Sequence, residues 1–221
     1  MPASSWSRRR FSRALPGAWL LPVAGLLPAC GREPMRGQPV PAGATVLALG
    51  DSLTFGTGAP PPAAYPAVLA ELTGWSVVNA GVPGDTAAQG AARLPALLDT
   101  HRPALVLVGL GGNDFLRQLP LADTRTALAQ ACQAARAAPA QVLLIAVPRP
   151  TLLSRVSDSL DDHPVYGELS EQLRVPLHRR GWSEVLQDPA LRADDIHANA
   201  AGYRQFAQGL LATLRAVGYR A

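Results

Sequence analysis

The chain contains little cysteine, which narrows the ways in which its fold could be stabilised. Cys30 and Cys132 are the only cysteines among 221 residues. Neither belongs to a C-x-x-C pair and no H-E-x-x-H pattern occurs, so we expect no metal site. A Cys30–Cys132 disulfide would require an oxidising compartment. The alternative is that Cys132, within the helical pattern ALAQACQAARAA, is a small buried residue with a free thiol.

Acidic residues are missing from the first 29 positions, which contain Arg8, Arg9, Arg10 and Arg13. The net charge of +4 would otherwise suggest an interaction with nucleic acid. The basic residues outside this segment equal the 16 acidic residues in number. The basicity therefore belongs to the N-terminal segment, and we expect no nucleic-acid partner.

Residues 1–29 have the organisation of an export signal. The basic stretch SRRRFSR precedes the apolar stretch ALPGAWLLPVAGLLPA, which is too short and too rich in proline for a membrane-spanning helix. The sequence LPAC at 27–30 resembles the lipobox of bacterial lipoproteins, in which the cysteine carries the lipid. We therefore expect an exported, periplasmic protein, anchored to the membrane by lipid at Cys30. A plain secretory signal is the alternative, and SRRRF also resembles a twin-arginine export motif.

Residues 30–44 are rich in Gly and Pro and are expected to form a flexible tether before one domain over 45–221. In the domain, apolar runs alternate with helical patterns, and no internal repeat occurs. Strands are expected at 45–50, 76–81, 104–111, 141–147 and 174–178. Continuously apolar strands indicate a parallel sheet covered on both faces. The fold class is therefore α/β, a three-layer α/β/α sandwich.

Four histidines are candidates for a catalytic base. His101 lies at a helix end, and the sequence around His163 and His178 offers no hydrophobic frame to hold either ring. His197 follows Asp194 by three residues in a short loop, just before a last helix for which Asn199 is the expected N-cap. From that position a carboxylate can reach the imidazole Nδ1–H and leave Nε2 free as an acceptor.

Three further residues follow expected strands and supply the remaining groups of a serine hydrolase. Ser52 is a nucleophile if a base takes its proton. Gly84 offers a backbone N–H where a side chain would obstruct the substrate, and Asn113 carries a neutral amide donor for an oxyanion. Each alone is explained as a turn residue. Together they should lie at the carboxyl edge of the sheet, where ligands bind in such folds.

Four short motifs resemble the conserved blocks of the SGNH (GDSL-type) hydrolases. They are G-D-S-L at 50–53, N-x-x-x-x-G-D-T at 79–86, G-G-N-D at 111–114 and D-x-x-H at 194–197, and the similarity extends over about residues 45–217. The stretches GDTAAQGAARLPALL and LVGLGGNDFLR are similar to the bacterial periplasmic acyl-CoA thioesterase/lysophospholipase/arylesterase branch. The chain departs from the family pattern at Pro83, Asp195 and Ala198. The α/β-hydrolase family is excluded because no G-x-S-x-G occurs.

The resemblance implies a flavodoxin-like sandwich with a five-stranded parallel sheet. It implies Ser52 as nucleophile, His197 as base, Asp194 as the acid that orients the base, and no metal or cofactor. It also implies an oxyanion hole formed by the Ser52 and Gly84 N–H groups and the Asn113 side chain. Asp51 and Asp114 are expected to bond to loop backbone rather than to react.

The substrate pocket is expected to involve Phe115, Leu116 and the loop at 148–167, with Leu152 and Leu153. Such a pocket suits small-molecule esters or thioesters of short to medium acyl chains, or aryl esters, hydrolysed by a monomer. One alternative is a carbohydrate O-deacetylase on the same scaffold. Another, from a different class, is a non-catalytic surface binding lipoprotein.

Overall fold

Five parallel strands form the central sheet, in the order β2-β1-β3-β4-β5. The computed structural model describes residues 35–149 and 160–220 and, outside these ranges, Met1 and Ala3. The strands are β1 (Thr45–Gly50), β2 (Ser76–Gly81), β3 (Leu105–Gly109), β4 (Gln141–Ile145) and β5 (Leu177–His178). The predicted five-stranded parallel sheet is therefore confirmed, with its last three strands shorter than expected.

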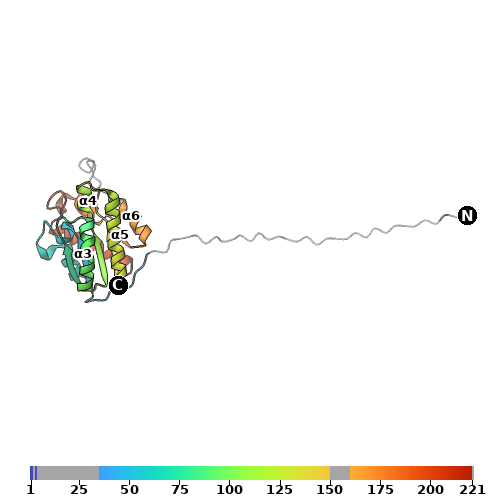
Figure 1. Cartoon of the computed structure of the whole chain (residues 1–221), viewed down its shortest axis with the longest axis horizontal. Helices are drawn as coiled ribbons and strands as arrows, with labels where there is room; N and C mark the ends of the chain where they lie inside the picture. The colour runs from blue at the N-terminus through green and yellow to red at the C-terminus, as the bar shows by residue number, and fades with distance from the viewer. Residues whose placement is uncertain (2, 4–34, 150–159, 221) are drawn as a thin grey trace. The chain divides into compact units, whose positions relative to one another are not determined.

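Helices cover both faces of this sheet, as the continuously apolar strands predict. The longer helices are α2 (Tyr65–Thr73), α3 (Ala87–His101), α5 (Leu121–Ala137), α6 (Val165–Leu173), α7 (Gly181–Gln187) and α8 (Ala200–Ala216). Helix α3 packs against α5 in one layer, and α8 packs against α2 and α7 in the other. Figure 1 shows α3 and α5 side by side in front of the sheet.

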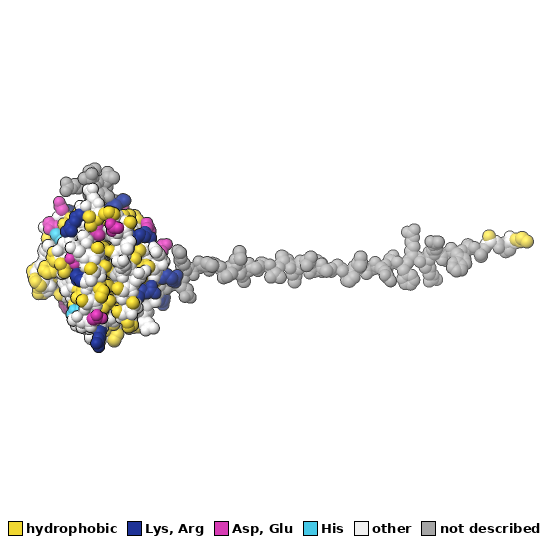
Figure 2. All heavy atoms as spheres, viewed as in Figure 1, with side chains coloured by type: hydrophobic (Ala, Val, Ile, Leu, Met, Phe, Trp, Pro, Cys, Tyr) yellow, Lys and Arg dark blue, Asp and Glu magenta, His cyan; other side chains and the backbone are white. Residues whose placement is uncertain are grey.

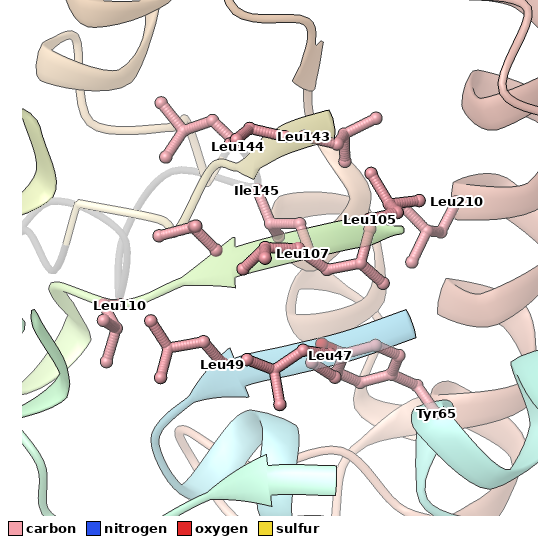
Figure 3. Packing of buried hydrophobic residues seen from close by; sticks show 14 of the residues in the cluster. Leu47, Leu49, Tyr65, Leu105, Leu107, Leu110, Leu143, Leu144, Ile145 and Leu210 are labelled. Carbon is pink, nitrogen blue, oxygen red and sulfur yellow. The ribbon is translucent and has the colours of Figure 1, made fainter. Parts of the chain in front are cut away.

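The centre of the core consists of aliphatic side chains from β1, β3 and β4. Leu47, Leu107 and Leu143 are fully buried. Figure 3 shows these strands side by side, with Tyr65 of α2 and Leu210 of α8 joining the cluster from the helices. Strand β2 is exposed along part of its length because it lies at the edge of the sheet.

The strand order also determines where a ligand can bind. The chain passes from β1 through α2 to β2 on one side of the sheet, and from β2 through α3 to β3 on the other. Both crossovers are right-handed, but they run in opposite directions across the sheet. The helices α2 and α3 therefore lie on opposite faces. A crevice then opens at the carboxyl ends of β1 and β3, which is where open α/β sheets bind ligands.

The structure differs from the tether prediction at residues 37–44, which lie against the domain. Gly37 N donates to Val217 O at 2.8 Å, and Val40 N donates to Tyr219 O at 2.8 Å. Val40 is 2% exposed, and its backbone carbonyl oxygen accepts a hydrogen bond from Trp75 Nε1. Pro and Gly therefore mark an irregular segment here, with a turn at 42–43, that is held by backbone hydrogen bonds and one buried valine.

Cys132 lies in α5, fully buried with a free thiol, as expected of a small residue in that helix. Burial raises the pKa of the thiol to about 12, so it is a poor nucleophile. Cys30 and the rest of the predicted signal lie outside the described residues.

Charge and hydropathy on the described surface are mixed. Figure 2 shows acidic and basic side chains interspersed over the face that carries α3 and α5. None of the helices in the described ranges combines the length and the apolar character that a bilayer crossing requires.

Candidate active site

Ser52 is the first residue of a short helix, α1 (Ser52–Phe55), directly after β1. Asp51 caps this helix, because its Oδ1 accepts from Leu53 N at 3.0 Å. The Asp51 carboxyl group is 2% exposed. Burial raises its pKa to about 6, against the opposing effects of the Leu53 N–H and of nearby His197. Asp51 thus holds the turn that presents Ser52.

His197 lies in a tight loop between the 3₁₀ helix Pro189–Leu191 and α8. Asp194 Oδ1 accepts from the backbone N–H groups of both Ile196 and His197 at 2.8 Å. The loop is closed by Ala193 N donating to His197 O at 2.9 Å. Asn199 caps α8 as predicted, since its Oδ1 accepts from Gly202 N.

The structure brings Ser52, His197 and Asp194 into one hydrogen-bonded chain. Ser52 Oγ lies 2.9 Å from His197 Nε2, and His197 Nδ1 lies 2.8 Å from Asp194 Oδ2. Partial burial acts to raise the pKa of Asp194. The hydrogen bonds from the His197 ring and from the N–H groups of Ile196 and His197 prevail and hold it below its usual range. Asp194 is therefore a carboxylate, which favours the tautomer with the proton on Nδ1 and an accepting Nε2.

Two contacts place the serine loop and the histidine loop next to each other. A Cβ at Gly58 would lie 2.6 Å from Ala198 O, and Gly58 also has a positive φ of 94°. Only glycine suits both conditions. Tyr203 of α8 donates its hydroxyl to Thr57 O at 2.7 Å, so the helix that follows His197 is bonded to the loop that follows Ser52.

Gly84 and Asn113 face the same site from the ends of β2 and β3. Gly84 has a φ of 87°, a conformation that favours glycine. Asn113, in the short helix α4 (Gly112–Leu116), donates one amide N–H to Asp85 O at 3.0 Å. Among the residues that the structure describes, no acceptor is found for the backbone N–H of Ser52 or of Gly84. Both amides remain available to a ligand.

Arg93 joins two of these loops and was missed by the sequence analysis. Its Nη2 donates to Gly50 O at 2.8 Å, and its Nε donates to Asp85 Oδ2 at 2.8 Å. The arginine of α3 thereby ties the end of β1 to the loop that carries Gly84. Asp114 acts similarly, accepting from Ala87 N at 2.8 Å. Asp51 and Asp114 thus bond to backbone N–H groups as expected, but the donors Leu53 and Ala87 belong to the first turns of α1 and α3 rather than to loops.

A cleft of about 720 Å³ opens beside Ser52. Leu116 lines it, as predicted, but Phe115 does not. The Phe115 ring stacks on His163 at 4.2 Å, because neighbouring residues of α4 point in different directions. Leu152 and Leu153 lie outside the described residues. Pro148 and Leu160 of the predicted loop at 148–167 do line the cleft. The sequence analysis missed several other lining residues: Thr57, Val147, Leu186, Arg192 and Ile196.

The prediction that His163 and His178 lack a hydrophobic frame is wrong. His163 is stacked on Phe115, and burial lowers its pKa, with nearby Arg149 adding to the effect. His178 is 4% exposed, and burial lowers its pKa to about 4. Its hydrophobic frame comes from α8, where the Phe206 ring packs edge-on at 5.2 Å, and Thr213 Oγ1 of the same helix lies 2.8 Å from Nδ1. That helix is far away in sequence, so no local pattern could reveal it.

Among residues 35–149 and 160–220, no three His, Cys, Asp or Glu side chains gather in a way that could hold a metal ion.

Comparison with known proteins points to one family. The model of the GDSL-like lipase/acylhydrolase family matches residues 48–205. Thioesterase 1/protease 1/lysophospholipase L1 of Escherichia coli strain K12 is 42% identical over 163 residues, which cover 72% of this chain and 77% of that protein.

Two further comparisons agree. Esterase TesA of Pseudomonas aeruginosa is 35% identical over 183 residues, which cover 79% of this chain and 89% of that protein. A crystal structure of TesA superposes with a TM-score of 0.69 at 33% identity, over 78% of this chain and 99% of the other.

Proposed function

The chain belongs to the GDSL-like lipase/acylhydrolase family, and we propose that it hydrolyses esters and thioesters of short to medium acyl chains, or aryl esters, through an acyl-enzyme on Ser52. It is a GDSL-type serine hydrolase, and its relatives include an esterase and a thioesterase. The observation that carries the mechanism is the 2.9 Å contact between Ser52 Oγ and His197 Nε2.

In the first step, Ser52 Oγ attacks the carbonyl carbon while its proton moves to His197 Nε2. Asp194 stabilises the imidazolium that forms and keeps the ring in place. As the tetrahedral intermediate collapses, the bond to the leaving group breaks and Nε2 returns the proton to that oxygen or sulfur. Water then attacks the acyl-enzyme, with His197 again taking and returning a proton.

The oxyanion of each tetrahedral intermediate needs donors that are already in position. We assign this role to the N–H groups of Ser52 and Gly84 and to the second amide proton of Asn113. Asn113 Nδ2 donates to Asp85 O at 3.0 Å and makes a longer contact of 3.5 Å with Asp51 Oδ2, which the oxyanion would replace.

Replacing Asn113 tests this assignment. Asn113→Ala should lower kcat by roughly 10²- to 10³-fold with little change in KM, the scale expected for one lost oxyanion donor. Steady-state hydrolysis of a p-nitrophenyl ester measures both constants. A rise in KM with unchanged kcat would instead mean that Asn113 binds the ground-state substrate.

The cleft supports an acyl or aryl ester as substrate. Its lining includes Leu116, Val147, Leu160 and Leu186, and its volume is large enough for a small ligand. p-Nitrophenyl esters of increasing chain length, assayed beside acetylated sugars, test the substrate class. Activity that peaks at about C4–C10 supports the proposal. Activity on acetyl groups alone would indicate a carbohydrate deacetylase, and no activity would indicate a binding lipoprotein.

The proposal also includes export and a lipid at Cys30, on a protein that acts as a monomer. The support is the LPAC sequence after a basic and an apolar stretch. In a bacterial host that processes lipoproteins, Cys30 should carry lipid, and Cys30→Ser should release soluble protein. Intact-mass measurement of the membrane fraction decides this. An unmodified thiol or a Cys30–Cys132 disulfide would refute it.

A further inference from the structure

Within residues 35–149 and 160–220, the exposed large hydrophobic side chains all lie at the carboxyl edge of the sheet, around the active-site cleft. We call this set the apolar rim, and each member has 41% to 52% of its surface accessible: Phe55, Val82, Leu116, Leu119, Leu121 and Ile196. Single exposed hydrophobic residues are common and need no explanation. Their restriction to one edge of the domain, in contrast, requires an explanation.

The topology explains why these residues share one edge. Phe55 ends α1 after β1, Val82 follows β2, and Leu116 ends α4 after β3. Leu121 is the first residue of α5, and Leu119 lies in the segment just before it; α5 begins at the same edge and runs back along the sheet. Ile196 precedes His197.

Hydrogen bonds join the loops that carry the rim. Asn79 Nδ2 donates to Phe55 O at 3.2 Å, which ties the end of α1 to β2. Arg117 Nη2 donates to Gly84 O at 2.9 Å, which ties the loop after α4 to the loop after β2. Leu116 and Ile196 line the cleft itself, so the rim is continuous with its mouth.

We propose that the apolar rim docks onto a zwitterionic phospholipid surface, from which amphiphilic ester substrates enter the cleft. This inference rests on the proposed function. Proximity to the cleft favours lipid over a protein partner, because a protein seated on the rim would close the mouth through which substrate must pass. A lipid surface covers the same side chains and supplies the substrate.

The charges near the rim point to a zwitterionic rather than an anionic surface. Exposed Arg117 and Arg149 are offset by exposed Asp123 and Asp195. Neither sign dominates, so apolar burial rather than charge attraction drives the docking. Raising the salt concentration should then change binding by less than about twofold, since salt screens only the charge interactions.

Vesicle flotation with phosphatidylcholine tests the proposal. The protein carries Cys30→Ser, so that no lipid at that residue contributes, and Ser52→Ala, so that no turnover occurs. It should float with the vesicles. Adding Phe55→Ser, Leu119→Ser and Leu121→Ser should lower the partition coefficient by roughly tenfold or more, given the apolar surface removed. These three side chains lie outside the cleft lining.

Ala137→Leu is the matched control, because it places an exposed leucine at the opposite end of α5 from Leu121. Partitioning should stay within about twofold, whereas general surface hydrophobicity would raise it. With Ser52 restored, the triple variant should hydrolyse a soluble monomeric ester at the wild-type rate.

Failure of the parent protein to float, or an unchanged partition coefficient in the triple variant, would overturn the docking proposal. Lack of ester hydrolysis by the protein with Ser52 intact would overturn the proposed function instead. The two failures are distinguishable because flotation uses the inactive protein.

Discussion

Ser52→Ala is expected to reduce kcat by about 10⁴-fold or more and to abolish covalent labelling by a fluorophosphonate probe. The loss is this large because nucleophile and base act as one unit, so that removing either leaves only binding and oxyanion stabilisation. The 2.9 Å contact between Ser52 Oγ and His197 Nε2 is the structural reason. Hydrolysis of p-nitrophenyl butyrate and mass spectrometry of the labelled peptide are the measurements.

Ser76→Ala provides the control. Ser76 is an exposed serine at the start of β2. It lies at the amino ends of the parallel strands, whereas the cleft lies at their carboxyl ends. Activity and labelling should be unchanged in this variant. Near-wild-type turnover in Ser52→Ala, or a label on another serine, would be incompatible with the proposed mechanism.

Asp194→Asn should lower kcat by roughly 10²- to 10⁴-fold, because an amide at this position favours the wrong imidazole tautomer. The carboxylate now accepts from His197 Nδ1 at 2.8 Å. An amide NH₂ in its place would donate to Nδ1, moving the ring proton to Nε2, where it blocks proton transfer from Ser52. Asn would still accept from the Ile196 and His197 N–H groups, so the loop should keep its shape.

Asp195→Asn is the matched control from the next residue. Asp195 lines the cleft, but the structure gives it no hydrogen bond to His197 among the described residues. Removing its charge should change kcat by less than about tenfold, the effect expected of a nearby charge that makes no hydrogen bond to the ring. The kcat of both variants, measured at several pH values, decides the assignment. If Asp195→Asn lost activity while Asp194→Asn stayed active, Asp195 rather than Asp194 would be the residue that orients His197.

Several elements of the fold follow directly from local sequence. Strand β1 is continuously apolar from Val46 to Leu49, and this predicts correctly that helices cover both of its faces. Asn199 is recognisable as an N-cap because capping involves only neighbouring residues. The tether prediction fails at 37–44 for the opposite reason: Gly and Pro describe the local backbone, whereas the hydrogen bonds to Val217 and Tyr219 come from the other end of the chain.

The sequence by itself determined the fold class, the family and the chemical groups of the candidate site, because these depend on residue types, local periodicity and short motifs. Only the tertiary structure decided how the groups meet. The approach of Gly58 to Ala198, the link from Arg93 to Gly50 and the burial of His178 all join residues distant in sequence. The same holds for the apolar rim, whose members are unremarkable in their own loops. Parallel strands place all these loops at one edge, and that placement exists only once the sheet has formed.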